Sequence, residues 1–270
     1  MSGDVRKFFY DNDTGLEAYF FNGISQPFPN HFHEHYVIGE AEAGKRHMVC
    51  KNRKYRLLPG ELVIFNPGDS HSCESTEPLV YRGINISKAV MSAAAERITG
   101  KNVLPVFSEN VIYNKRAADR FRQLHCMITG GSLSGEKGDL LHLLTAQLIE
   151  AYARSGDTGA SECCSEVETV CSFVEKNYMK HMTLKDMCRC SNMSSSTLLR
   201  AFAAEKGITP YRYLLTVRIS RAKELLRAGA APVEAAMQTG FSDQSHFTSF
   251  FNMFTGVPPA EYSRIFKDGG

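Results

Sequence analysis

The chain lacks the long hydrophobic run that a signal peptide or a membrane-spanning helix requires. Its N-terminal stretch, MSGDVRKFFYDNDTG, has no apolar segment. No window of about 18 uninterrupted apolar residues occurs elsewhere in the chain, whereas a transmembrane helix needs about 20 such residues and a secretory signal needs an apolar core. We therefore expect a cytoplasmic protein that has no membrane partner.

Charge of one sign is also scarce, since 31 Lys and Arg residues against 29 Asp and Glu residues leave a formal net charge of +2. This balance neither requires nor excludes a nucleic-acid partner. The eight cysteines include the pairs Cys163–Cys164 and Cys188-x-Cys190, which lack the C-x2-C spacing of a zinc site. Because the cytoplasm disfavours disulfides, we interpret them as reduced thiols, with redox sensing by an exposed thiolate as the alternative.

A length of 270 residues and a hydrophobic content of 43% are typical of a globular protein with two domains. The seam between them is predicted at 155–162, SGDTGASE, where small and polar residues interrupt two helical patterns. Before it, helices are predicted at 115–129 and 138–154. Short strand-like runs separated by Gly, Pro and Asn indicate an antiparallel β-barrel or roll; they cover Leu16 to Phe21, Tyr36 to Ala41, His47 to Cys50 and Leu62 to Phe65.

After the seam the chain is predicted to be helical, and one unit occurs twice. Ser196, Phe202, Gly207, Pro210 and Tyr213 recur as Ser245, Phe251, Gly256, Pro259 and Tyr262, each at an offset of 49 residues.

Each unit has a short helix, a tight turn and a second helix, which is the helix-turn-helix layout. The short helices are predicted at 184–190 and 233–239, and the second helices begin behind the N-caps Ser194 and Asp243. Residues 210–227 can form a connecting helix of roughly 27 Å. Successive major-groove faces on one side of B-DNA lie about 34 Å apart, so this connector could place both second helices in adjacent grooves.

The second helix of the second unit, within GFSDQSHFTSFFNMFTG (240–256), gathers four phenylalanines on one face and small polar side chains on the other. Such polar side chains can bond to base edges or phosphates, although a plain solvated surface is the alternative. The predicted DNA-contacting residues of the two second helices are Ser195, Ser196, Leu199, Arg200, Gln244, Ser245, His246 and Ser249. Arg200 is the best candidate base reader, because a guanidinium can donate two hydrogen bonds to guanine.

These residues resemble the AraC/XylS family of bacterial transcription regulators. The family signature G-F-x-D-x-S-x-F-x-x-x-F followed by G-x-x-P matches from Gly240 to Pro259, and RISRAKELL (218–226) resembles the family's linker helix. The resemblance covers nearly all of residues 165–266. Members usually carry Arg or Lys where this chain has Ser249 and Asn252, and Lys where it has Ala203, which implies fewer phosphate contacts.

The N-terminal half resembles the cupin-like sensory domain of the same family through HFHEHYVIG (31–39), Gly44, PGEL (59–62) and NPGDSH (66–71). In such a barrel His31, His33 and His71 come close together, with Tyr36 as a further candidate ligand-binding residue. They could hydrogen-bond an organic effector, ligate a divalent metal, or serve structure alone.

The metal alternative lacks a full ligand set, since the position of the Glu ligand of metal-binding cupins falls on Val37. Pairing His33 with His35 instead brings Glu40 into register but changes the spacing to Gly44. We expect no cofactor other than a small-molecule effector of unknown identity.

We therefore predict an α+β multidomain protein: a cupin-like barrel at 1–112, a helical dimerisation segment at 113–155, a linker at 156–164 and a double helix-turn-helix domain at 165–270. The predicted function is ligand-responsive, sequence-specific DNA binding. The alternative is a metal-dependent cupin enzyme tethered to a DNA-binding module, for which the ligand set is incomplete. The resemblance also implies contact with RNA polymerase, while activation and repression both remain open.

A homodimer is predicted through the helix at 138–154, because its apolar side chains exceed one core-facing stripe. Leu140, Leu144 and Leu148 are the expected contacts between the two copies. The alternative is that the helix at 115–129 covers the surplus.

Overall fold

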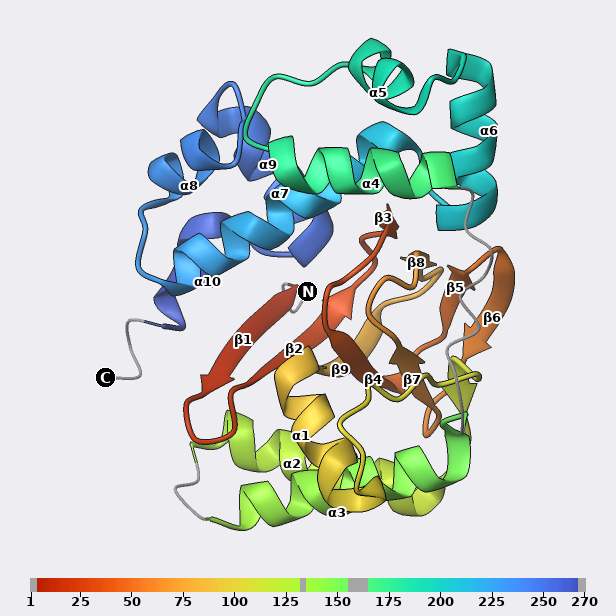
Figure 1. The fold of residues 1–270 in the computed structure, drawn as a ribbon. Helices are drawn as coiled ribbons and strands as arrows, with labels where there is room; N and C mark the ends of the chain where they lie inside the picture. Colours follow the sequence, from red (N-terminus) through yellow and green to blue (C-terminus); the bar gives the residue numbers. More distant parts are fainter. Residues whose placement is uncertain (1–3, 132–134, 155–164, 267–270) are drawn as a thin grey trace. The chain divides into compact units, whose positions relative to one another are not determined.

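The computed structural model describes residues 4–131, 135–154 and 165–266 (Figure 1). Their contacts divide the chain into two compact units. The first comprises Met1–Pro27, His33–Asp69 and Cys73–Thr158, and the second comprises Phe28–Phe32, Ser70–Ser72 and Gly159–Gly270. The predicted linker at 156–164, with Cys163 and Cys164, lies outside the described residues.

The strands of the described residues form two sheets. The six-stranded sheet has the order β1 (Val5–Asp11), β2 (Leu16–Ile24), β9 (Leu79–Ile86), β4 (Tyr36–Ala43), β7 (Leu62–Phe65) and β10 (Val111–Ile112), with antiparallel neighbours. The four-stranded sheet has the order β3 (Phe28–His31), β8 (His71–Glu74), β5 (Arg46–Cys50) and β6 (Arg53–Leu57). The four predicted strand-like runs lie within β2, β4, β5 and β7, which confirms the antiparallel β-sheet architecture.

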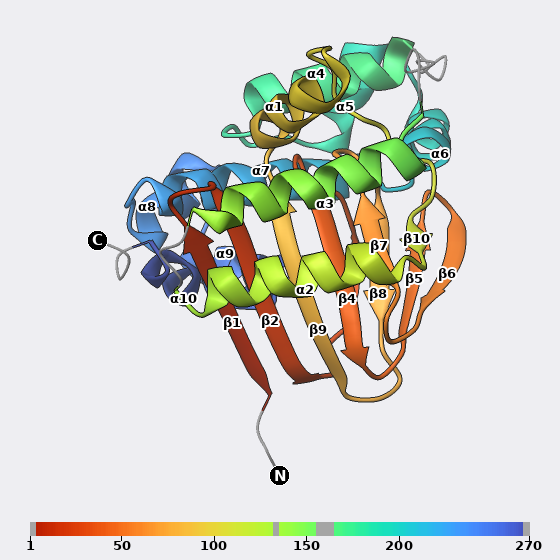
Figure 2. The same cartoon turned by 90° about the horizontal axis from the view of Figure 1, so that it is seen from below.

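Three helices pack on the six-stranded sheet: α1 (Lys88–Thr99), α2 (Lys115–Thr129) and α3 (Glu136–Tyr152). Figure 2 shows α2 and α3 crossing one face of that sheet. The range of α2 is the predicted one, whereas α1 was not predicted. The sequence did carry signals for α1, because Ser87 accepts a hydrogen bond from the Val90 N–H and Gly100 ends the helix at φ 71°.

The apolar surplus of α3 is covered within the same chain. Leu144 and Leu148 have no exposed surface, and Leu140 is partly buried against the core that the sheet forms with α1 and α2. The sheet, α1 and α2 therefore cover these side chains of α3 within the same chain. The prediction that Leu144 and Leu148 form a dimer contact is wrong, because neither side chain is accessible to a second copy.

Two ion pairs fasten these helices to the sheet. The ammonium of Lys137 on α3 pairs with the buried carboxylate of Asp11 at the end of β1, and it also lies 3.1 Å from Asp13. On α2, the Arg122 guanidinium donates to the carboxylate of Glu40, which is 1% exposed, with an Nε–Oε1 distance of 2.9 Å. Both pairs join elements that lie far apart in the sequence.

The described helices of the second unit are α4 (Ser165–Asn177), α5 (Leu184–Ser191), α6 (Ser195–Lys206), α7 (Pro210–Arg227), α8 (Pro232–Gln238), α9 (Gln244–Thr255) and α10 (Pro259–Arg264). The pairs α5–α6 and α8–α9 form two helix-turn-helix units, and α7 connects them. The short helices α5 and α8 lie within one residue of their predicted ranges, α7 has its predicted range, and α6 and α9 begin directly after the predicted caps. The flanking helices α4 and α10 were not predicted as separate elements.

The internal repeat is visible in the packing of aromatic rings. Phe202 and Tyr213 meet edge to face with ring centroids 5.5 Å apart, and Phe251 and Tyr262 repeat this contact at the same 5.5 Å. Both second helices also end at a glycine with positive φ, 68° at Gly207 and 88° at Gly256. Equivalent residues of the two repeats therefore make the same packing contact and end the second helix in the same way.

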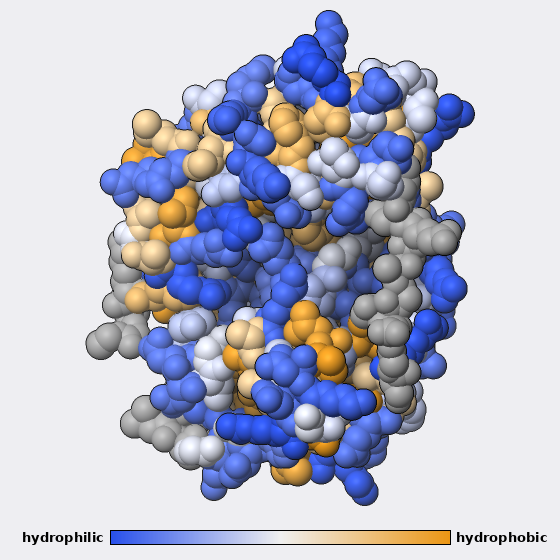
Figure 3. Space-filling model, viewed as in Figure 1, coloured by the Kyte–Doolittle hydropathy of each residue, from blue (hydrophilic) through white to orange (hydrophobic). Residues whose placement is uncertain are grey.

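Among the described residues, no helix is long and apolar enough to cross a membrane. The visible face of the chain is mostly hydrophilic, and its hydrophobic residues form separate patches (Figure 3).

Candidate nucleic-acid interface and sensor site

The two second helices begin with side-chain caps that fix where each helix starts. The Ser194 hydroxyl accepts a hydrogen bond from the Thr197 N–H ahead of α6, and the Asp243 carboxylate accepts one from the His246 N–H at 2.7 Å ahead of α9. The His246 N–H bond to the carboxylate lowers the pKa of Asp243, which stays ionised at the positive end of the helix.

Burial then decides which face of each helix is available. Leu198 and Phe202 anchor α6, and Phe247, Phe251 and Phe254 anchor α9, all buried. The eight predicted DNA-contacting residues all lie on the exposed surface of their helices: Ser195, Ser196, Leu199, Arg200, Gln244, Ser245, His246 and Ser249. Both helices therefore present hydrogen-bonding side chains outward from an apolar base.

Positive charge is unevenly divided between the two helix-turn-helix units. In the first helix-turn-helix unit (α5 and α6), Lys185, Arg189 and Arg200 are exposed. In the second unit neither α8, PVEAAMQ, nor α9, QSHFTSFFNMFT, contains Lys or Arg. Electrostatic attraction to a phosphate backbone is consequently stronger in the first unit.

Arg218 on α7 is a structural residue that the sequence analysis did not single out. Arg218 is only 7% exposed. Its guanidinium donates to the carbonyl oxygens of Tyr178 (2.8 Å) and Lys180 (2.9 Å), and it lies 5.7 Å from the ring centroid of Phe241. Gly240 allows this close approach, since a Cβ there would lie 2.7 Å from the Tyr178 carbonyl.

Arg218 thereby links the residues that follow α4 to the turn of the second helix-turn-helix unit. The sequence carried a signal for this role, because Arg218 stands between the apolar residues Val217 and Ile219 of the linker helix. The structure shows that both neighbours are buried.

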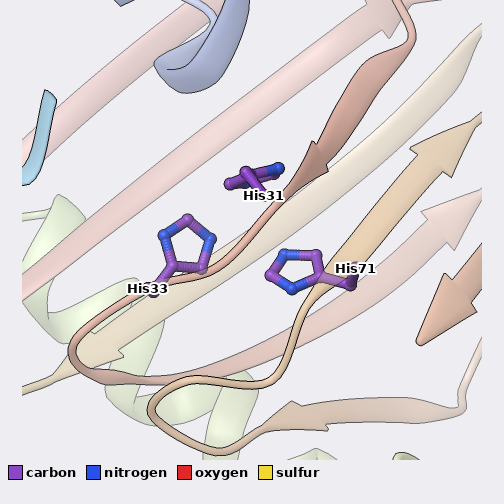
Figure 4. Close-up of side chains that lie close together, drawn as sticks. All are labelled: His31, His33 and His71. Atoms are coloured by element: carbon purple, nitrogen blue, oxygen red, sulfur yellow. The ribbon is translucent and has the colours of Figure 1, made fainter. Parts of the chain in front are cut away.

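The three predicted sensor histidines do come together, as Figure 4 shows. Each of His31, His33 and His71 offers a ring nitrogen, and these nitrogens lie within 4.8 Å of one another. His31 and His71 are 4% and 3% exposed, with ring centroids 4.6 Å apart, and His33 is half-buried. Neighbouring strands β3 and β8 supply the two buried rings.

Tyr36 is not part of this cluster. Its hydroxyl donates to the Pro105 carbonyl at 2.8 Å, and its ring packs on Phe107 in the core beneath the helices. Successive strand residues face opposite sides, so Tyr36 shares its side of β4 with Ile38 and Glu40. The prediction that Tyr36 binds ligand is therefore wrong. Glu40, the acid of the alternative register, is held by Arg122.

A second polar cluster in the first unit was missed because its members are scattered along the sequence. Arg46 on β5 is 7% exposed, and its guanidinium lies 4.3 Å from the ring centroid of Tyr81 on β9. Burial opposes its charge, but the neighbouring Cys73 thiol and the Tyr81 and Tyr19 hydroxyls outweigh burial and raise the pKa of Arg46. For Tyr81 it is burial itself that raises the pKa, to about 12. The cluster thus joins a buried guanidinium on the four-stranded sheet to a tyrosine ring on the six-stranded sheet.

Two family models match the chain in the order in which its domains occur. A model described as an AraC-like ligand binding domain matches residues 14–145, and one described as a helix-turn-helix domain matches residues 187–265. The HTH-type transcriptional regulator YbfI of Bacillus subtilis (strain 168) is 41% identical over 249 residues, covering 91% of this chain and 90% of that protein. The transcriptional activator RhaS of Salmonella arizonae is 24% identical, with 83% of each chain covered.

Among solved structures, apo ToxT K231A from Vibrio cholerae has a similar fold, with a TM-score of 0.60 and 14% identity over 96% of this chain and 99% of that one. The fold, the domain order and the extent of the match with YbfI all agree with the resemblance in the motifs. The chain belongs to the AraC family of transcriptional regulators and is a ligand-responsive DNA-binding protein of that type.

Proposed function

We propose that α6 and α9 read base edges in the major groove. The observation that carries this proposal is the pair of capped helices whose apolar sides are buried and whose polar sides are exposed. Ser, Gln and His side chains on α9 can bond to bases or phosphates, and Arg200 on α6 can donate twice to guanine. The exposed positions of all eight predicted residues support these roles.

The connecting helix α7 sets the distance between the two proposed recognition helices, α6 and α9. At 1.5 Å per residue, the 18 residues of α7 span about 27 Å, a little less than the roughly 34 Å between successive major-groove faces. Arg218 makes α7 and its flanking turns one packed body. We therefore propose that one chain reads two base clusters about one DNA turn apart.

We further propose that the sensor domain binds its effector at His31, His33 and His71, and that this changes operator binding. Differential affinity for two states of the protein is the physical requirement for such a response. The proposed activity involves no catalysis, and the enzyme alternative has no support in the relatives. Because the proposed partner is bacterial DNA, we also propose that the protein is cytoplasmic.

A homodimer and a contact with RNA polymerase are also proposed. The relative RhaS carries the name of a transcriptional activator, which supports the proposed contact with RNA polymerase. Any dimer contact on α3 would use accessible residues such as Leu143, which is 45% exposed. Pairing two chains would let two operator half-sites bind with an effective-concentration advantage.

Selection of DNA from a random pool by the full-length protein tests the reading of bases. We expect a bipartite site whose two elements are centred about 10 base pairs apart. Enrichment of a single short element would contradict the two-helix reading. Absence of any enrichment at low salt would contradict sequence-specific binding altogether.

A further inference from the structure

We propose that His31, His33 and His71 bind one divalent transition-metal ion, and that this ion is an effector of the sensor domain. The three ligand nitrogens already lie within 4.8 Å of one another (Figure 4). His31 ends β3, His33 follows two residues later, and His71 begins the neighbouring strand β8. This inference names the chemistry of the proposed effector site and therefore rests on the proposed function.

The hydrogen bond of His31 sets which of its nitrogens can bind a metal. Its Nδ1 lies 2.7 Å from the Pro29 carbonyl oxygen. A carbonyl only accepts hydrogen bonds, so Nδ1 carries the proton and Nε2 keeps a lone pair. An N–H bond from the second ring nitrogen to a backbone carbonyl is the usual way in which proteins orient a metal-binding histidine.

The packing of His31 against His71 brings two of the three proposed ligands together. The two buried rings have centroids 4.6 Å apart at an interplanar angle of 50°. Both rings are therefore held close enough to contribute to one metal site. A bound cation would in turn stabilise the arrangement.

Only small side-chain movements are needed to complete the site. With metal–nitrogen bonds of 2.0–2.1 Å, tetrahedral ligands lie about 3.3 Å from one another. The nitrogens would therefore approach by about 1.5 Å at most, which rotation of the half-buried His33 and of two rings can supply.

Three neutral imidazoles select a particular class of ion. Imidazole suits Zn²⁺, Co²⁺, Ni²⁺ and Cu²⁺, whereas Mg²⁺ and Ca²⁺ take oxygen ligands. Glu34 follows His33 in the sequence but is not a member of the cluster. Asp69, two residues before His71, pairs with Lys51 and accepts hydrogen bonds from Asn66 and Asn110. Three protein ligands leave one tetrahedral position for water or an anionic ligand, on the side where His33 is partly exposed.

Cobalt titration of the untagged, EDTA-treated full-length protein tests the site. We expect one Co²⁺ per chain with the visible absorption of four-coordinate cobalt, and its displacement by Zn²⁺. His33→Ala should weaken Co²⁺ binding about tenfold or more. His181→Ala is the matched control, because His181 is exposed and lies outside the cluster, and it should bind like the wild type.

Cysteine is the competing ligand in a chain that has eight of them. Thiolate-to-cobalt charge-transfer bands in the near ultraviolet would place the ion on cysteines and overturn the proposal. Equal affinity in the wild type and His33→Ala would overturn it as well. His33→Ala is the decisive variant because its side chain is half-buried, so that its fold, followed by circular dichroism, should be kept where His31→Ala or His71→Ala could unfold.

Operator binding is measured separately, in EDTA and with Zn²⁺ added. A metal-dependent change in operator affinity that is lost in His33→Ala supports the ion as effector, whereas metal binding without such a change contradicts that role. Failure of the wild type to bind selected DNA under either condition would instead count against the proposed function, because the cobalt titration needs no DNA.

Discussion

Arg200 lies on the exposed face of α6, where its Nε donates to the Ser196 carbonyl of the previous turn at 3.3 Å. We expect Arg200→Ala to weaken operator binding by about 1–3 kcal/mol and to relax selectivity at one base pair. Arg200→Lys distinguishes a base contact from a phosphate contact, since it keeps the charge and loses the two-pronged donor geometry. Full affinity and selectivity in the lysine variant would show that Arg200 contacts phosphate. The measurement is binding to operator variants by fluorescence anisotropy.

Arg218 provides a prediction about stability at the same scale. Arg218→Met leaves the buried carbonyls of Tyr178 and Lys180 without their charged donor, so the free energy of unfolding should fall by about 2–3 kcal/mol. Arg221→Met is the control three residues further along α7: Arg221 pairs with Glu224 at the surface, and such pairs contribute about 0–1 kcal/mol. Urea denaturation followed by circular dichroism measures both. Equal losses in the two variants would contradict the structural role of Arg218.

At the scale of elements, the link between β1 and α3 should make stability depend on pH. Burial raises the pKa of the Asp11 carboxyl, but its bonds to the Lys137 ammonium and to Thr14 outweigh burial and hold the pKa below its usual value of 3.8. A carboxyl with a lowered folded-state pKa stabilises the fold above its unfolded pKa, and this stabilisation is lost as the pH falls further, through the folded pKa. We expect the urea concentration at the unfolding midpoint to decrease once the pH is lowered below about 4, and to decrease less in Asp11→Asn than in the wild type.

Removing the cation tests the same link at neutral pH. Lys137→Met should lower the free energy of unfolding by about 3 kcal/mol, because it leaves the Asp11 carboxylate buried without its ammonium partner. Asp13→Asn is the matched control, since the Asp13 side chain is 65% exposed and should contribute little. A small effect of Lys137→Met would mean that water reaches Asp11 and replaces the ammonium.

At the scale of the whole molecule, the uneven charge of the two helix-turn-helix units predicts an uneven response to salt. Each Lys or Arg that neutralises a phosphate adds about 0.9 to the slope of log affinity against log salt. Lys185→Ala with Arg189→Ala should therefore flatten the slope, whereas Ser245→Ala with Ser249→Ala should lower affinity at an unchanged slope. Titrations of one operator at several salt concentrations measure this. An unchanged slope in the first double variant would remove the first unit as the electrostatic anchor.

Much of the architecture followed from local patterns. The range of α2 and the range of α7 were predicted without error, because the periodicity of apolar residues and the capping residues act within a few residues of each other. The double helix-turn-helix unit followed from the 49-residue offset, since one packing solution was written twice in the same residues. The exposed faces of α6 and α9 were predictable for the same reason: their phenylalanines and leucines indicate the buried side directly.

The sequence by itself therefore determined the two domains, their order, the recognition helices and the histidines that approach one another. Only the tertiary structure decided what covers α3, on which side of β4 Tyr36 lies, and that Arg218 and Arg46 are buried. Helical periodicity reports that a helix has two apolar sides, but it does not report whether a neighbouring helix or a second copy covers them. Contacts such as those of Arg218 with Tyr178 and Phe241 join residues 40 and 23 positions away, and no local pattern encodes them. Such contacts depend on how the elements pack, because burial is a property of the assembled core and not of any one segment.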